Sequence, residues 1–378
     1  MNAHRLNRIA TGSLFFLSGL CNATWASRIP TIQQTLKLSN GAMGGVLMSA
    51  PLGLIASMPL AGWLIHTRGS RNVAGAAAVL YATTLVIIGA VPNAIILVGT
   101  LFFFGFFGNL LNIAMNTQAV EVEELYGRSI MASFHGLWSL ASFVGAFTGA
   151  YMLGINVSPF GHFLLIGVLA AAITGMCYPM LVRNAVPEAG NVPWIVKPDK
   201  TLILLAFIAL GVMICEGAMA DWSGIYFKKV VHTEAAFVGF GYAAFTCTMA
   251  LGRFLADGLV GRLGMKKVLE GSGLLIALGL TLVISYPRFQ TSILGLLLVG
   301  AGTSSVIPLV FSSVGKTKKT NPATALASVS TIGFMGLLFG PPLIGFISGA
   351  TSLRVAFGFV ALLGLMISVL ATRLRSAP

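Results

Sequence analysis

Two carboxylates interrupt an otherwise apolar stretch of the sequence, MICEGAMADWSG at residues 213–224. The chain has only ten acidic residues, and a polar side chain inside an apolar helix is costly and often functional. Glu216 and Asp221 are five positions apart, which on an α-helix means about 140° around the axis and about 7.5 Å along it. They do not share one face, so the spacing argues against a paired-carboxylate site and favours two separate roles.

Glu216 is the deeper of the two acids, and the sequence predicts no basic residue at its depth in any apolar run. A carboxylate held in a low dielectric can take up and release a proton when its surroundings change. We therefore interpret Glu216 as a proton-coupling residue. Two alternatives stay open, namely a hydrogen-bonded structural glutamate and a direct ligand for a cationic substrate.

Asp221 lies nearer the predicted outer end of its helix, at the level where Arg28 ends the first apolar run. Each residue is almost the only charge of its sign at that level. We predict an ion pair between them that closes an external gate. The alternative is a static, solvent-exposed pair, which contributes little to stability.

Three asparagines recur on one helical face, because Asn109, Asn112 and Asn116 are spaced i, i+3 and i+7. Each amide offers two donors and one acceptor, which suits a hydroxyl-rich or neutral polar solute. We predict that they line a substrate cavity. The alternative is packing between helices, where amide contacts in membranes contribute about 0.6–2 kcal/mol.

Two further segments carry candidate substrate-binding residues. Asn22 and Trp25 follow Ser18 at helical spacing, and an indole beside an amide suits stacking on a sugar face. Trp25 also fits an aromatic belt at the membrane interface. Trp138 lies in FHGLWSLAS (134–142), in which His135 fits a gate or a structural role as well as it fits substrate contact.

The composition identifies the elements that must position these residues. Charged residues make up 9% of the chain and hydrophobic residues 56%, whereas a soluble domain carries about 25% charge. The sequence therefore predicts an all-α membrane protein, and its net charge of +13 indicates membrane topology more than nucleic-acid binding. The four cysteines have no metal-ligand spacing and no H-E-x-x-H occurs, so we expect no disulfide, metal or cofactor.

Twelve apolar runs are long enough to cross a bilayer, which takes about 20 residues per helix. We expect residues 1–30 to hold an uncleaved first helix and not a secretory signal, because many more spans follow. The predicted spans are 9–29, 41–65, 72–91, 94–118, 129–154, 159–182, 201–227, 236–260, 267–286, 290–314, 323–349 and 354–373.

The basic residues are distributed unevenly between the two sides of this topology. With the N-terminus inside, sixteen Lys and Arg residues lie on cytoplasmic segments and six on external ones. By the positive-inside rule, both termini are expected in the cytoplasm.

The sequence also predicts two halves. Residues 183–200, RNAVPEAGNVPWIVKPDK, form a polar connection between residues 1–182 and 201–378. GWLIHTRGSRNV (62–73) and DGLVGRLGMKKV (257–268) are equivalent at an offset of 195 residues, which aligns Gly69 with Gly264. Tandem six-helix halves with a binding site at their interface are a known transporter design.

These two loops resemble the signature G-x-x-x-D-R-x-G-x-R/K of the major facilitator superfamily. Gly62, Gly69 and Arg71 match it, whereas His66 and Thr67 replace its acidic–basic pair. The resemblance implies a cytoplasmic gate. Topology signals alone, or an intrahelical pair at i and i+4, remain open as alternatives. The expected gate residues are Gly62, Gly69, Arg71, Arg253, Asp257 and Arg262.

Within that superfamily, ATWASRIPTIQ (23–33), FHGLWSLAS and GFMGLLFGPPLIG (333–345) resemble a bacterial inner-membrane branch of rhizopine transporters related to fucose–proton symporters. The resemblance implies a sugar, polyol or inositol-like solute. Symporters of the fucose type carry acids in spans one and four, where this chain has asparagines. That difference argues against proton coupling through the N-terminal half.

We therefore expect a monomeric secondary transporter of the inner membrane that binds one small polar solute and protons, with import favoured over export. An efflux pump that exchanges protons for amphipathic or cationic compounds is the nearest alternative. A transporter-like receptor without turnover is a third possibility. The sequence contains no paired-histidine metal motif, G-x-S-x-G or Walker loop that would indicate an intramembrane enzyme.

Overall fold

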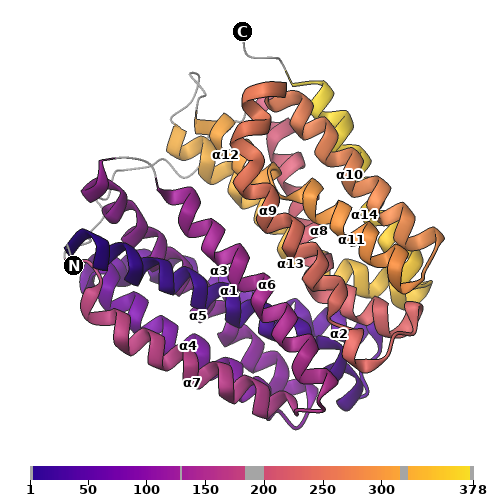
Figure 1. The fold of residues 1–378 in the computed structure, drawn as a ribbon, viewed down its shortest axis with the longest axis horizontal. Coiled ribbons are helices and arrows are strands. Elements are labelled where there is room, and N and C mark those ends of the chain that lie inside the picture. The colour runs from indigo at the N-terminus through magenta and orange to yellow at the C-terminus, as the bar shows by residue number, and fades with distance from the viewer. Residues whose placement is uncertain (1–2, 128–129, 184–199, 316–321, 375–378) are drawn as a thin grey trace. The chain divides into compact units, whose positions relative to one another are not determined.

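The computed structural model describes residues 3–127, 130–183, 200–315 and 322–374, which are helical almost throughout (Figure 1). The predicted connection 183–200 lies almost entirely outside these ranges, as do six of the basic residues used to predict the topology. The helices of the N-terminal half are α1 (Ala3–Thr35), α2 (Asn40–Leu47), α3 (Ser49–Arg68), α4 (Ser70–Ile88), α5 (Ala94–Tyr126), α6 (Met131–Gly154), α7 (Pro159–Cys177) and the short η1 (Tyr178–Met180).

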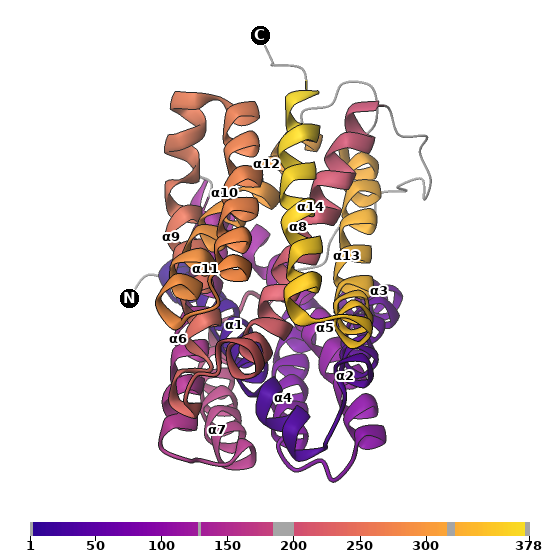
Figure 2. The same cartoon turned by 90° about the vertical axis from the view of Figure 1, so that its right-hand side faces the viewer.

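The C-terminal half repeats this arrangement of long helices, several of which run side by side in Figure 2. Its helices are α8 (Lys200–Tyr226), α9 (Phe240–Leu263), α10 (Met265–Ser285), α11 (Phe289–Thr303), α12 (Val306–Gly315), α13 (Pro322–Ala350) and α14 (Leu353–Thr372). The π-helical turn η2 (Phe227–Val231) and the short η3 (Ala235–Phe237) connect α8 to α9. As α2 with α3 and α11 with α12 each form one crossing, the fold has twelve transmembrane helices in two six-helix bundles.

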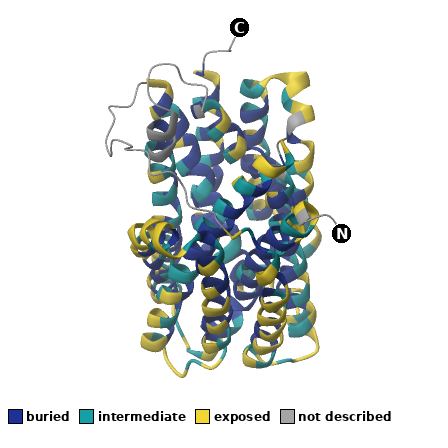
Figure 3. Cartoon of the chain, turned by 90° about the vertical axis from the view of Figure 1, so that its left-hand side faces the viewer, coloured by how far each residue is buried: buried dark blue, intermediate teal, exposed yellow. Residues whose placement is uncertain are grey.

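Eleven of the described segments are long and apolar enough to cross a membrane. The first helix, α1, is absent from that set although it has 33 residues. Figure 3 shows the buried residues on the inner sides of the helices and many exposed ones facing outward. The exposed residues include Ile95, Phe254, Phe346 and Leu362, each more than half exposed, as expected where lipid tails replace water.

Each bundle is held together by close helix pairs. In the N-terminal bundle α1 packs along α6 and α3 along α5; in the C-terminal bundle α8 packs along α13 and α10 along α14. Small residues permit the closest approach. A Cβ atom added at Gly53 of α3 would collide with the Phe102 carbonyl of α5, and one added at Gly105 of α5 would collide with the Ala50 carbonyl.

The two halves share a turn geometry that the sequence repeat predicts. Gly69 joins α3 to α4 with φ 78° and ψ 147°, and Gly264 joins α9 to α10 with φ 79° and ψ 151°. This backbone region is accessible to glycine and strained for other residues. The offset of 195 residues therefore preserves a glycine where the chain must turn between neighbouring spans.

The chain divides into two compact units that exchange short segments. Unit 1 holds Met1–Leu38, Gly45–Ala189 and Ala235–Gly239, and unit 2 holds Ser39–Gly44, Gly190–Glu234 and Phe240–Pro378. Within unit 2, Lys229 Nζ donates to Asn40 Oδ1 over 2.8 Å, and a Cβ at Gly44 would lie 2.9 Å from the Gly345 Cα. The two exchanged segments occupy equivalent positions of the repeat.

Candidate functional site

The acidic residues of α8 belong to a polar group inside unit 2. Glu216 is half-buried, and its Oε1 atom is buried without a hydrogen-bond partner among the described residues. Arg253 of α9 interacts electrostatically with Glu216. The prediction that no basic residue lies at the depth of Glu216 is therefore wrong. It failed because Arg253 was assigned only to the cytoplasmic gate, although it lies within a span.

Tyr242 of α9 lies within electrostatic range of this pair and of Asp221. Its side chain is buried, and it interacts electrostatically with Asp221, Glu216 and Arg253. These four residues are called the α8–α9 cluster below. The sequence analysis missed Tyr242, although a phenol within an apolar span is a detectable signal because its hydroxyl needs a partner.

Arg28 of α1 belongs to unit 1. Its side chain is fully buried. Its Nε atom donates to Nδ1 of His162 on α7 over 3.2 Å, while Nη1 and Nη2 have no hydrogen-bond partner among the described residues. The predicted pair with Asp221 would join the two units and stays a prediction.

His162 is a residue that the sequence analysis missed. It is also fully buried, and its Nε2 atom has no hydrogen-bond partner among the described residues. It is an imidazole in the apolar run 159–182, so the rule that polar residues within spans mark functional positions would have identified it.

The three asparagines of α5 fall into two groups. Asn109 is buried and donates to the Leu54 carbonyl over 3.2 Å and to the Ser57 Oγ over 2.8 Å, both on α3. These bonds support the helix-packing interpretation for Asn109. Asn116 and Asn112 are half-buried, and the Asn116 Nδ2 donates to the Asn112 carbonyl over 2.8 Å and to its Oδ1 over 3.1 Å.

The aromatic candidates differ in burial. Trp25 is buried in unit 1, where its ring lies 6.5 Å from that of Phe104, which stacks on Tyr81 at 4.4 Å. This position excludes a lipid-facing belt. Asn22 and Trp138 are half-buried, so part of each side chain remains accessible.

The residues of the two repeated loops take part in local contacts. Arg71 donates from Nε to the Tyr178 carbonyl over 3.0 Å, and its guanidinium lies 4.4 Å from the centre of the Tyr178 ring. Gly62 and Arg262 are exposed. The side chain of Asp257 lies outside the described residues. The cytoplasmic gate stays a prediction.

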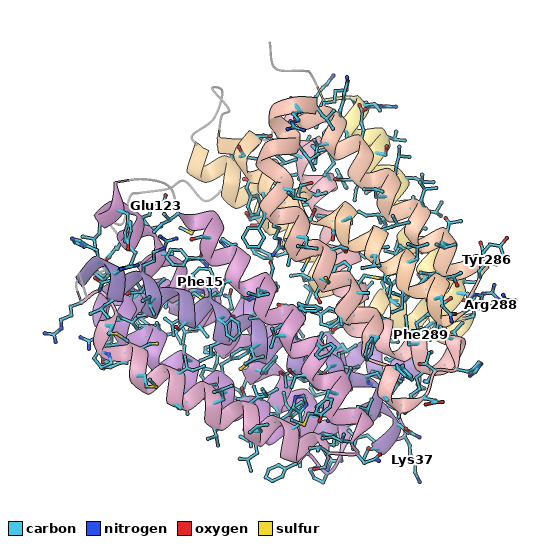
Figure 4. The ribbon with its side chains drawn as sticks, viewed as in Figure 1. Phe15, Lys37, Glu123, Tyr286, Arg288 and Phe289 are labelled. Atoms are coloured by element: carbon cyan, nitrogen blue, oxygen red, sulfur yellow. The ribbon has the colours of Figure 1, made fainter. Side chains whose placement is uncertain are left out.

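Glu123 and Gln118 of α5 bond to neighbouring elements of unit 1. The Glu123 carboxylate, labelled in Figure 4, accepts from the backbone nitrogens of Ile130 and Met131 over 2.7 Å each, at the start of α6. Gln118 donates to Ser70 Oγ over 2.7 Å and accepts from the Val182 nitrogen over 2.8 Å. Neither residue was singled out from the sequence. In the described ranges no group of three or more His, Cys, Asp or Glu residues could hold a metal ion.

Comparisons with known proteins give one consistent result. A model of the Major Facilitator Superfamily matches residues 201–378. An uncharacterized MFS-type transporter of Yersinia pestis is 34% identical over 367 residues, which cover 96% of this chain and 94% of the relative. An uncharacterized transporter of Sinorhizobium fredii is 32% identical, with coverages of 96% and 96%. The membrane protein MosC of Rhizobium meliloti is 30% identical, with coverages of 96% and 89%.

Two kinds of solved structure share the fold. A variant of the nucleoside transporter NupG superposes with a TM-score of 0.77 at 14% identity, covering 98% of this chain and 99% of NupG. A bacterial homolog of the human lysosomal transporter Spinster, in an inward-facing and occupied conformation, gives a TM-score of 0.74 at 14% identity, with coverages of 98% and 97%. At these identities the likeness extends to the fold alone.

Proposed function

The chain belongs to the major facilitator superfamily, so it is a multi-pass membrane transporter and not an enzyme, and from this premise we propose that it imports a small polar solute together with protons. The mechanism is alternating access, in which a central site opens to one side of the membrane at a time. The solute belongs to the sugar, polyol or inositol-like class. The α8–α9 cluster carries the proposal, because it holds a carboxylate and an arginine inside a membrane-spanning bundle.

In this proposal, proton coupling uses the electrostatic attraction between Glu216 and Arg253. In the proposed cycle, ionised Glu216 is stabilised by Arg253, and protonation of Glu216 removes that attraction. The change also alters the environment of Tyr242, which interacts with both acids of the cluster. Uptake and release of one proton can thereby bias the packing of α8 against α9.

The accessible amides support a hydroxylated solute. Asn112 and Asn116 are half-buried and form a hydrogen-bonded pair, and Asn22 is half-buried on α1. Amide groups pair with hydroxyls both as donors and as acceptors. We assign substrate contact to these residues with Trp25 and Trp138, and helix packing to Asn109. The sequence resemblance to rhizopine transporters and fucose–proton symporters favours the same solute class.

The proposal also covers the residues of the two gates, the membrane in which the transporter lies and its oligomeric state. Arg28 with Asp221 closes the external side, and Gly62, Gly69, Arg71, Arg253, Asp257 and Arg262 act on the cytoplasmic side. The excess of Lys and Arg on alternate loops supports cytoplasmic termini in a bacterial inner membrane. The transporter works as a monomer.

The test is solute accumulation in proteoliposomes with an imposed pH gradient. The probes are radiolabelled myo-inositol, L-fucose and D-gluconate. We expect wild-type protein to accumulate at least one probe and Glu216→Gln to lose accumulation while retaining exchange of labelled for unlabelled solute, because exchange needs no net proton movement. Glu234→Gln is the matched control, since it removes the same charge from an exposed position.

Accumulation that persists in Glu216→Gln would overturn the coupling role, and a wild-type protein that accumulates none of the probes would overturn the solute class.

A second comparison addresses the efflux alternative. Arg253 beside Glu216 disfavours a cationic ligand at that carboxylate, because like charges repel. Exchange of protons for a cationic dye, blocked by Glu216→Gln, would instead support efflux.

A further inference from the structure

A group of unpaired hydrogen-bond donors lies inside unit 1, around Arg28. Thr24 and Arg28 are four positions apart on α1 and therefore share a helix face. His162 of α7 accepts a hydrogen bond from Arg28. All three side chains are fully buried. We call Thr24, Arg28 and His162 the Arg28 site.

The unpartnered polar atoms of the Arg28 site are mainly hydrogen-bond donors, and the Thr24 hydroxyl can also donate. Arg28 uses Nε for His162, which leaves the Nη1 and Nη2 donors without partners among the described residues. Since Nδ1 of His162 accepts that bond, the proton of the neutral imidazole is on Nε2, and this donor has no partner either. The Thr24 hydroxyl is also unpartnered. A ligand that satisfies such a set must offer acceptors.

The positive charge of the Arg28 site also favours a ligand that offers acceptors. A guanidinium stays protonated in proteins and is costly to bury without a counter-ion. No carboxylate of the described residues bonds to its nitrogens. In a transporter a buried ionisable residue of this kind marks the substrate pathway. When the proposed external gate is open and Arg28 is separated from Asp221, the counter-charge is therefore best supplied by the solute.

The geometry selects the class of anion. With Nε engaged, Nη1 and Nη2 remain as the end-on pair of donors that binds the two oxygens of a carboxylate. A single guanidinium balances one negative charge, whereas a phosphate monoester carries nearly two. A monocarboxylate therefore matches the site better than a phosphorylated sugar does.

We propose that the Arg28 site binds the acidic group of the solute, so that the transported compound is a hydroxylated monocarboxylate of the sugar-acid class. This inference rests on the proposed function and narrows its solute class. Arg28 contacts the carboxylate directly, and His162 is a positioning residue that fixes the guanidinium. The half-buried amides of α1 and α5 bind the hydroxyl groups of the same molecule.

The experiment compares two probes that differ at one carbon, D-gluconate and D-glucitol. Equilibrium binding to the purified full-length protein is followed by the ligand-induced shift of its thermal midpoint. We expect gluconate to bind wild-type protein at least about 10-fold more tightly than glucitol, since only gluconate supplies the carboxylate. Arg28→Gln should remove this preference and leave the weak affinity for glucitol unchanged.

Two further variants make the result specific. Arg28→Lys keeps the charge but loses the paired donors, so its preference for gluconate should be intermediate. Lys37→Gln removes the same unit of charge from an exposed residue near the end of α1, whose side chain extends away from the ribbon in Figure 4, and should bind as wild type does. If Arg28→Gln does not yield folded protein, the inference is tested by the gluconate preference of Arg28→Lys, which should be smaller than that of Lys37→Gln.

Equal affinity of wild-type protein for the two probes, or no binding of gluconate, would overturn the inference. So would a gluconate preference that survives Arg28→Gln and Arg28→Lys. Loss of the gluconate preference in Asp221→Asn, to the same extent as in Arg28→Gln, would also overturn it, because Arg28 would then act through Asp221 and not on the solute. These outcomes are separable from the proposed function, because accumulation of myo-inositol that depends on Glu216 requires no gluconate preference.

Discussion

The Nε atom of Arg28 donates a hydrogen bond to Nδ1 of His162 over 3.2 Å, in a fully buried part of the N-terminal unit. This bond joins α1 to α7 and fixes the proton of the neutral imidazole on Nε2. It also leaves the end-on donors of the guanidinium unpaired. The orientation of this buried guanidinium thus depends on a histidine 134 positions further along the chain.

The first prediction concerns the role of His162 in positioning Arg28. His162→Ala should weaken gluconate binding about 10-fold, as expected for loss of about 1.4 kcal/mol from a hydrogen bond to a charged group. The affinity for glucitol should not change. His162→Asn places an acceptor near the position of Nδ1 and should restore part of the preference. Titration of both probes against the three proteins measures this, and equal weakening for both probes would indicate a purely structural histidine.

The second prediction separates the asparagines of α5. Asn109→Ala removes two hydrogen bonds to α3 and should lower stability by about 0.6–2 kcal/mol, the range for amide contacts in membranes. Asn116→Ala removes an amide that, among the described residues, bonds to Asn112, and it should weaken solute binding with a smaller effect on stability. Thermal midpoints and binding isotherms measured on the same samples check both effects. The assignment is wrong if the two variants exchange these effects.

The third prediction concerns the repeated turn. Gly69→Ala and Gly264→Ala should each lower the free energy of unfolding by about 1–2 kcal/mol, because both glycines adopt a positive φ that a Cβ disfavours. The two costs should be alike, since the dihedral angles are nearly identical. Gly62→Ala is the control in the first loop, as nothing lies within 4 Å of its added Cβ. Thermal unfolding of the three variants measures these costs. The prediction is wrong if alanine destabilises the protein at only one of the two turns.

Much of the fold could be predicted because a bilayer imposes a simple rule on sequence. Uninterrupted apolar runs of about 20 residues identify membrane helices. The boundaries were less accurate. The fourth span was expected to end at residue 118, whereas α5 continues to Tyr126, where Gly127 ends it in a left-handed conformation. Beyond the bilayer, polar residues continue a helix without any change in backbone pattern, so hydropathy does not detect its end.

The candidate site could be predicted only in part. The sequence indicates how deep in the membrane a residue lies, but not which neighbouring helix its side chain faces. Glu216 and Asp221 were identified from their rarity in an apolar run, yet their neighbours Tyr242 and Arg253 come from another helix. Helical spacing placed the three asparagines on one face, but Asn109 bonds to α3 whereas Asn112 and Asn116 bond to each other. Which helix covers a given face depends on tertiary packing, which a single sequence does not specify.

The exchanged segments determine whether the two halves of the polypeptide could fold separately. Each unit includes a short stretch from the opposite half of the polypeptide, Ser39–Gly44 in one case and Ala235–Gly239 in the other. A gene split within the polar connection would therefore yield two fragments, each lacking part of its own compact unit and exposing the part that belongs to its counterpart. Neither fragment would be self-sufficient, and co-expression would allow each to complete the other.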